Sequence, residues 1–114
     1  MTRLRLAAAA AIIATVGFGA LGAALASAPA TVTPATVTID NFAFMQPTIT
    51  VAAGTTVTWT NNDDIPHTVR AVDGSFHSAA LDSADHYSFT FTKPGVYSYF
   101  CSLHPKMVGK VIVK

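Results

Sequence analysis

The sequence predicts an all-β protein, an antiparallel Greek-key β-sandwich that follows an N-terminal signal helix. Three observations support this fold class. Most segments after residue 35 alternate polar and apolar residues with a period of two, and Gly, Pro, Asn and Asp residues separate these segments at short intervals. No segment has the period of a good amphipathic helix. The pattern predicts seven or eight short strands.

The first thirty residues differ in composition from the rest and predict export. Arg3 and Arg5 precede a long run rich in Ala, Leu, Ile and Gly, and small residues then follow in the pattern of a cleavage site. This layout is typical of a secretory signal peptide, so we expect residues 1–26, or up to 28, to be removed. The run approaches the ~20 apolar residues of a membrane span, and a retained anchor is therefore the alternative. Residues 27–35 form a flexible lead-in to a folded domain at residues 36–114.

The alternation also defines the strands of the domain in chain order. Val57 and Trp59 illustrate the pattern, since they share one face of their strand while threonines occupy the other. Residues 42–47 end at a proline, which suits an edge or a bend. Residues 73–85 are expected to form a loop with a short helical turn. The predicted strands are residues 36–40, 48–51, 55–60, 86–92, 96–101 and 108–114, with a further short strand at 68–72.

The charge of the chain limits its partners. The sequence has seven Lys and Arg residues and six acidic residues, all of them Asp. Removal of residues 1–26 takes away two of the basic residues, so the mature chain carries a charge of about −1. It has no basic stripe for nucleic acid. With the signal removed, we expect no stable membrane insertion.

Three potential metal ligands recur at three-residue intervals at Cys101, His104 and Met107. An extended chain would separate residues three apart by about 10 Å, so these side chains can meet only if the segment curls. His67 is a fourth candidate, which the fold must bring in from 34 residues upstream. Two His, one Cys and a weak axial Met form the ligand set of a blue-copper electron-transfer site.

Cys101 is the only cysteine of the chain, so it cannot form an intramolecular disulfide. In an exported protein it is a free thiol, half of an intermolecular bridge or a metal ligand. The neighbouring His and Met favour ligation. We interpret His77 and His86 as surface residues, and Asp63 and Asp64 as a solvated turn.

These motifs resemble the cupredoxins, the type 1 blue copper family, and within it the amicyanin branch more than plastocyanin or pseudoazurin. The gap of two residues between His104 and Met107 is the spacing of that branch. Thr68 differs, because these proteins usually have Asn after the first ligand His. The similarity covers nearly all of the domain and is carried by residues 47–54, 56–61, 66–67, 89–92, 95–97 and 101–113.

The resemblance implies a site that binds one type 1 copper ion, and it implies a cupredoxin-like sandwich around it. It also implies that Asn61 tethers the two ligand loops, with an amide hydrogen bond near the Cys101 sulfur. The implied ligands are His67, Cys101 and His104 as strong ligands and Met107 as the weak axial ligand.

The function expected from these features is an exported carrier, periplasmic or otherwise extracytoplasmic, that shuttles single electrons through the Cu(I)/Cu(II) couple. The resemblance implies transient protein redox partners, a donor dehydrogenase and an acceptor that is a c-type cytochrome or an oxidase. A copper-binding or delivery protein without a redox circuit is the alternative. We expect no enzyme, because His77 and His86 do not form a second metal centre.

Overall fold

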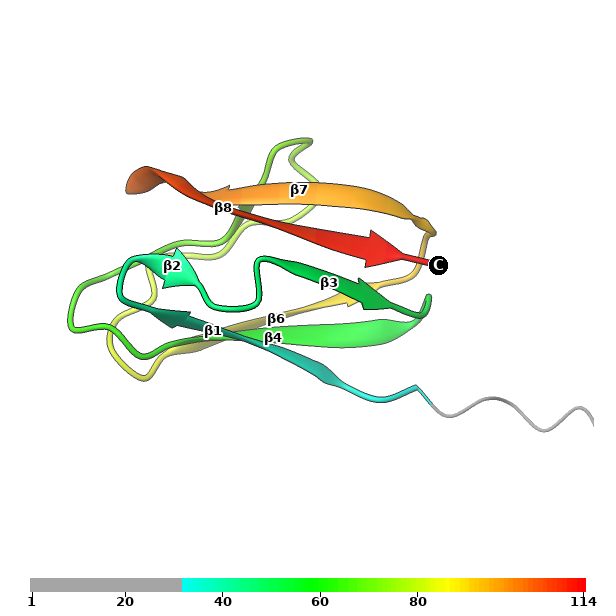
Figure 1. The fold of residues 1–114 in the computed structure, drawn as a ribbon, viewed down its shortest axis with the longest axis horizontal. Coiled ribbons are helices and arrows are strands. Elements are labelled where there is room, and N and C mark those ends of the chain that lie inside the picture. Colours follow the sequence, from blue (N-terminus) through cyan, green and yellow to red (C-terminus); the bar gives the residue numbers. More distant parts are fainter. Residues whose placement is uncertain (1–31) are drawn as a thin grey trace, which may run out of the picture. The chain divides into compact units, whose positions relative to one another are not determined.

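Eight strands pack as two four-stranded sheets over residues 32–114, the part of the chain that the computed structural model describes (Figure 1). The expected signal peptide and most of the lead-in lie outside the described residues. No helix long and apolar enough to cross a membrane occurs among the described residues.

The two sheets have four strands each, and their order differs from the order along the chain. The first sheet has the order β2 (Ala43–Phe44), β1 (Ala35–Asp40), β4 (Thr55–Asn61) and β6 (His86–Phe91). The second sheet has the order β3 (Thr48–Val51), β8 (His104–Val113), β7 (Gly95–Cys101) and β5 (Arg70–Ala71).

The all-β sandwich is confirmed, but its sheets are mixed rather than wholly antiparallel. β1 pairs with β4 in parallel, and β3 pairs with β8 in parallel. The other four pairings are antiparallel, as expected. Alternation along a strand reports which face a residue occupies and carries no information about the direction of the neighbouring strand.

The core lies between the sheets and is rich in aromatic rings. Trp59 on β4 is fully buried and packs against Phe76 at 5.7 Å and Tyr99 at 5.4 Å between ring centroids. The predicted shared face of Val57 and Trp59 on β4 is confirmed as the buried one, and β1 and β8 bury alternate residues in the same way. The buried residues that show this are Val37 and Ile39 of β1, Val57 and Trp59 of β4, and Val111 and Val113 of β8.

The long connection between β5 and β6 is a loop without the helical turn that we expected. Several of its backbone groups bond to the preceding segment: Ser78 N donates to Val69 O and Leu81 N donates to His67 O. Phe76 and Leu81 are buried, at 3% and 5% exposure. The loop therefore covers part of the core with Phe76 and Leu81, and its backbone is hydrogen-bonded to that of His67.

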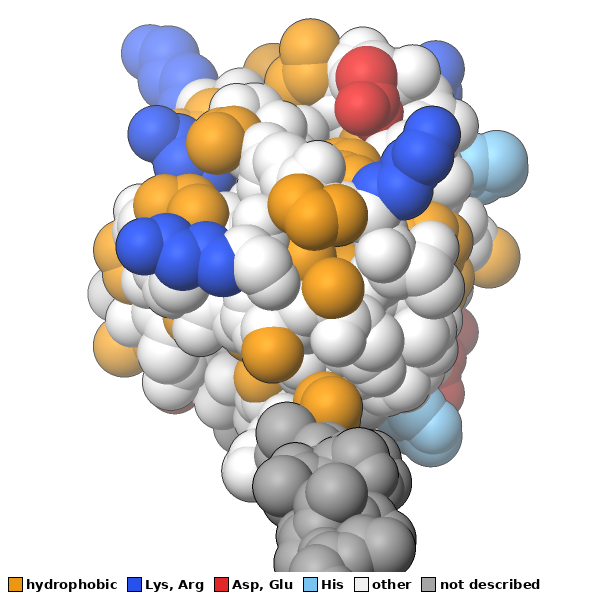
Figure 2. All heavy atoms as spheres, turned by 90° about the vertical axis from the view of Figure 1, so that its right-hand side faces the viewer, with side chains coloured by type: hydrophobic (Ala, Val, Ile, Leu, Met, Phe, Trp, Pro, Cys, Tyr) orange, Lys and Arg blue, Asp and Glu red, His pale blue; other side chains and the backbone are white. Residues whose placement is uncertain are grey.

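One end of the sandwich gathers the ligand-bearing segments. β4 and β7 both run toward this end and β8 begins there, at the left of Figure 1. The turn between β7 and β8 consists only of residues 102–103, because β8 starts at His104 rather than at the expected Val108. Figure 2 shows the opposite end, where Lys and Arg side chains are scattered among polar and apolar ones.

Candidate metal centre

Three predicted donors meet at this end of the sandwich. The Sγ atom of Cys101 lies 3.7 Å from Nδ1 of His67 and 3.7 Å from Nδ1 of His104. One donor atom from each residue lies within 4.8 Å of the others, and this is the only such cluster of three among residues 32–114. His67 and Cys101 are fully buried. The curl that the spacing requires is a pairing across the β7–β8 turn, which places Cys101 opposite His104.

Met107 lies on β8 and is 5% exposed. It lines a surface hollow of about 470 Å³ together with His104 and Leu103. The structure thus places the thioether on the same strand and beside the same hollow as one of the imidazoles.

The chemistry of the donor set fits copper. A thiol sulfur and two imidazole nitrogens suit a soft or borderline transition ion, whereas Mg²⁺ and Ca²⁺ take oxygen ligands. Both His residues direct Nδ1 at the sulfur, so one small volume receives all three donors. A bound cation would also deprotonate the Cys101 thiol, which gives the site a stronger donor than the free protein has.

Thr68 joins the segments that carry His67 and Cys101. Its backbone N–H donates to Cys101 Sγ at 3.3 Å. Its hydroxyl oxygen accepts from Ser102 N at 2.7 Å and lies 2.8 Å from Ser102 Oγ. Thr68, which stands where the resemblance leads one to expect Asn, therefore has two roles. Its backbone N–H gives the hydrogen bond to the Cys101 sulfur, and its hydroxyl links the two loops.

The expectation that Asn61 tethers the two ligand loops is wrong. Its side-chain amide donates to Ile65 O at 2.9 Å and to Leu81 O at 2.8 Å. Its carbonyl oxygen accepts from Asp63 N at 2.9 Å. None of these partners lies in the segment that carries Cys101 and His104, so Asn61 joins the loop before His67 to the β5–β6 loop, and Thr68 links His67 to the Cys101 segment.

Asp63 contacts a predicted ligand, and the sequence reasoning missed this contact. Its Oδ2 lies 2.7 Å from Nε2 of His67, and its two oxygens accept hydrogen bonds from Asn41 N at 2.6 Å and Phe42 N at 2.9 Å. Desolvation raises the pKa of Asp63, but the bonds from Phe42, His67 and Asn41 outweigh it and hold that pKa below its ordinary value. The adjacent Asp64 is exposed, as a solvated turn predicts.

Phe42 is the second residue that was missed. Its ring lies edge-on to His104 at 5.1 Å and to His67 at 5.6 Å between centroids, although the side chain is 51% exposed. Its backbone φ is 59°, and that of Asn41 is 50°. The left-handed backbone of Phe42 could not be predicted from the sequence, because that conformation is common for Gly and Asn and rare for bulky residues.

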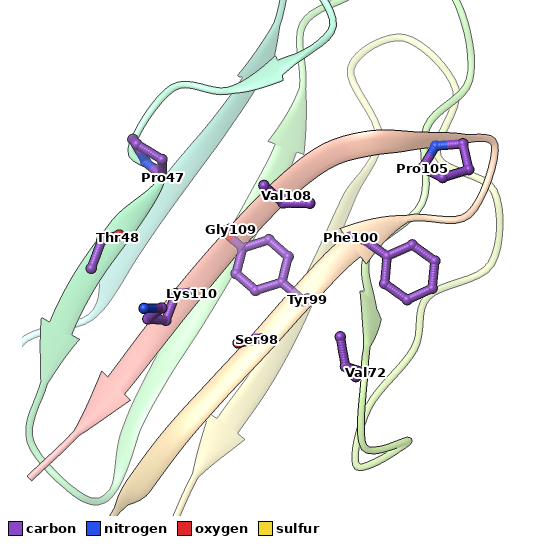
Figure 3. Close-up of a pocket in the computed structure, with 10 residues that line it drawn as sticks. All are labelled: Pro47, Thr48, Val72, Ser98, Tyr99, Phe100, Pro105, Val108, Gly109 and Lys110. Carbon is purple, nitrogen blue, oxygen red and sulfur yellow. The ribbon is translucent and has the colours of Figure 1, made fainter.

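A second groove of about 460 Å³ lies along the second sheet, and Phe100 and Pro105, the neighbours of Cys101 and His104 in the sequence, are among its lining residues. Figure 3 shows its lining, in which Phe100 and Val72 stand on one side, and Pro47 and the first residue of β3, Thr48, on the other. None of the four predicted ligands lines it. The hollow beside His104 is thus the opening that belongs to the candidate metal centre.

The two-sheet sandwich and its His–Cys–His cluster, in which His67 and Cys101 are buried and His104 is half-buried, define a copper-binding protein of the cupredoxin class. The family model described as copper binding proteins of the plastocyanin/azurin family matches residues 31–114. The chain belongs to this family.

Relatives and solved structures agree with the assignment, and they confirm the resemblance to the amicyanin branch. Amicyanin-alpha of Methylorubrum extorquens is 39% identical over 83 residues, which are 68% of this chain and 70% of that protein. Amicyanin of Paracoccus denitrificans is 41% identical over 83 residues, which are 68% of this chain and 63% of that protein. The chain thus spans slightly under two thirds of the latter relative. Plastocyanins also match.

A solved structure of an amicyanin variant in its Cu(I) form has a TM-score of 0.68 and 34% sequence identity to this chain. The match covers 71% of this chain and 82% of that one. The similarity in fold therefore extends over most of the residues that the structure describes.

Proposed function

We propose that the protein is an exported type 1 copper protein that carries single electrons between redox partners. The observation that carries this proposal is the position of the Cys101 sulfur, 3.7 Å from Nδ1 of both His67 and His104 in a site held by strand ends. We assign these three residues as strong ligands and Met107 as the weak axial ligand. Copper, when bound, supplies a one-electron Cu(I)/Cu(II) couple.

The frame around the donors suits such a couple, because little geometry needs to change between the two oxidation states. Cys101 ends β7 and His104 begins β8, so each is attached to a paired strand. His67 is held by a reciprocal pair of backbone bonds with Leu81, of 3.1 and 2.7 Å. The Thr68 hydroxyl then links the two segments. A preorganised site of this kind lowers the cost of rearrangement during each transfer.

Partners would approach the end of the sandwich where His104 is half-buried. Around it lie Leu103, which is 52% exposed, and Phe42, which is 51% exposed. A small apolar surface suits weak, transient encounters with protein redox partners. We propose a dehydrogenase as donor and a c-type cytochrome or an oxidase as acceptor.

Export is supported by the N-terminal sequence. Two arginines, an apolar run and small residues at the expected cleavage site precede the domain. We therefore propose cleavage after residue 26 and an extracytoplasmic location. N-terminal sequencing of the protein secreted from a bacterial host tests this, since a retained anchor would leave residue 1 in place.

A copper-delivery protein without a redox circuit is the competing function, and burial of the donors argues against it. His67 and Cys101 are both 0% exposed, so an acceptor site or chelator cannot reach them without opening the loops. Electrochemistry combined with a chelator challenge separates the two functions. An electron carrier should cycle reversibly between Cu(I) and Cu(II) and retain its ion against a mild chelator. Rapid loss of copper to that chelator would favour delivery.

A further inference from the structure

We propose that Asp63 is a positioning residue for the copper site, which fixes the His67 ring for ligation and holds the Phe42 ring against both imidazoles. This inference rests on the proposed function. It comes from one carboxylate that joins the β1–β2 turn to a metal ligand, through contacts of 2.6, 2.9 and 2.7 Å to Asn41 N, Phe42 N and His67 Nε2.

The contact to His67 selects one tautomer of the ring. An ionised carboxylate only accepts hydrogen bonds, so Nε2 carries the hydrogen that is donated to Asp63. Nδ1 then has a free lone pair, and Nδ1 is the atom that faces Cys101 Sγ at 3.7 Å. The carboxylate therefore fixes the tautomer and the orientation of the ring before a metal ion binds.

The contacts to the backbone hold a strained turn. Asn41 and Phe42 both have positive φ values, 50° and 59°, and for a phenylalanine that conformation is unfavourable. Both backbone N–H groups converge on Asp63. Two consecutive N–H groups form a small concavity for an anion. The Asp63 carboxylate therefore stabilises the left-handed backbone of this turn, which is sterically unfavourable for Phe42.

The held turn places an aromatic ring against the ligands. The Phe42 ring is nearly perpendicular to the rings of His67 and His104, with interplanar angles of 87° and 85°. Phe42 is 51% exposed, so its ring contacts both imidazoles while part of the side chain stays open to solvent. Asp63 thus acts on His67 directly and on His104 through Phe42.

The test compares Asp63→Asn with Asp64→Asn in the 114-residue chain. Asp64 is the adjacent, exposed carboxylate, so its variant has the same change of charge. An amide at position 63 has one acceptor oxygen where the carboxylate has two, so it cannot accept from Asn41 N, Phe42 N and His67 Nε2 together. With its oxygen on Asn41 N, its N–H₂ group faces Nε2 and favours the tautomer with hydrogen on Nδ1. Imidazole ¹⁵N–¹H spectra of the metal-free protein report the tautomer, and cross-relaxation between Phe42 and His104 protons reports the ring contact.

We expect Asp63→Asn to lose the single His67 tautomer and the Phe42–His104 contact, while Asp64→Asn keeps both. Affinity for Cu(II), measured relative to Cu(I), should fall about 10–100-fold in Asp63→Asn. For a one-electron couple, each tenfold loss raises the reduction potential by about 59 mV. A Phe42→Leu variant should keep the tautomer and lose only the ring contact.

The proposal is overturned if Asp63→Asn keeps the wild-type tautomer and ring contact, even if its stability falls, because Asp63 would then only support the turn. It is also overturned if the two Asp variants bind copper equally. Both spectroscopic readouts use the metal-free protein. They therefore decide the role of Asp63 even if the wild-type chain fails to form a blue copper site.

Discussion

The backbone N–H of Thr68 donates a hydrogen bond to the sulfur of Cys101 across 33 positions of the sequence, at 3.3 Å. The hydroxyl of the same threonine accepts from the backbone of Ser102 at 2.7 Å. One residue therefore connects the segment of the first ligand with the turn between β7 and β8, and it does so from a position that is 8% exposed.

Replacing Thr68 with Val removes the hydroxyl but keeps the shape and the backbone bond to sulfur. We expect a loss of about 1 kcal/mol in the free energy of unfolding of the metal-free protein, because the bond to Ser102 N is lost. Copper should also dissociate faster, since the two loops are no longer joined. Urea unfolding curves and chelator-driven loss of copper measure both effects. Thr68→Ser is the control, because it keeps the hydroxyl, and equal results for both variants would exclude the tether.

Gly109 allows Tyr99 to pack across from it in the β7–β8 pair (Figure 3). A Cβ atom at Gly109 would lie 2.3 Å from Cζ of Tyr99 and 2.4 Å from its Oη. Gly109→Ala should therefore reduce the free energy of unfolding by about 1–3 kcal/mol through overpacking. Denaturant unfolding checks this prediction. In a Tyr99→Leu background, Gly109→Ala should reduce the free energy of unfolding much less. An equal reduction in both backgrounds would show that the clash with the Tyr99 ring is not the cause.

Tyr99 should make the protein sensitive to alkaline pH. Burial raises the pKa of Tyr99 to about 12. The indole N–H of Trp59 opposes that shift, although the pair does not meet hydrogen-bond geometry. Between pH 10 and 12 the unfolded state binds fewer protons than the folded state, so the free energy of unfolding falls as pH rises through this interval.

Tyr99→Phe removes the ionisable group and should abolish this loss. Near pH 8 the variant should be as stable as the wild type or more stable, because the buried hydroxyl has no hydrogen-bond partner among residues 32–114. By pH 11 its advantage should grow by about 1 kcal/mol. Urea midpoints at several pH values measure the difference. A constant difference from pH 8 to 11 would show that Tyr99 ionises as easily in the folded protein as in the unfolded one.

Local patterns carried most of what the sequence could predict. Alternation identified the strands and their buried faces, since a period of two is a direct consequence of strand geometry. The spacing of Cys101 and His104 indicated their approach, because residues that are close in sequence need only a turn to meet. His67 lies 34 residues before Cys101, so it could be named as a candidate ligand from its residue type, but its approach to the sulfur depended on the fold.

Features that depend on pairing between distant segments were not predictable. The parallel partnership of β1 with β4 leaves no mark on either strand. Asp63 looked like part of a solvated turn, and only the folded chain brings it to His67. Phe42 combines a left-handed backbone with a bulky side chain, a combination that propensities disfavour. These residues surround the site, so the ligands were easier to predict than the side chains that hold them.

The optical and EPR spectra of the copper-loaded chain, recorded beside those of Cys101→Ser, test the central claim most directly. The account predicts one Cu(II) ion per chain and an intense blue colour that depends on the Cys101 sulfur. Cys101→Ser should lose the colour while His67 and His104 remain in place. A colourless copper-loaded protein, or a blue colour that persists in Cys101→Ser, would contradict the account.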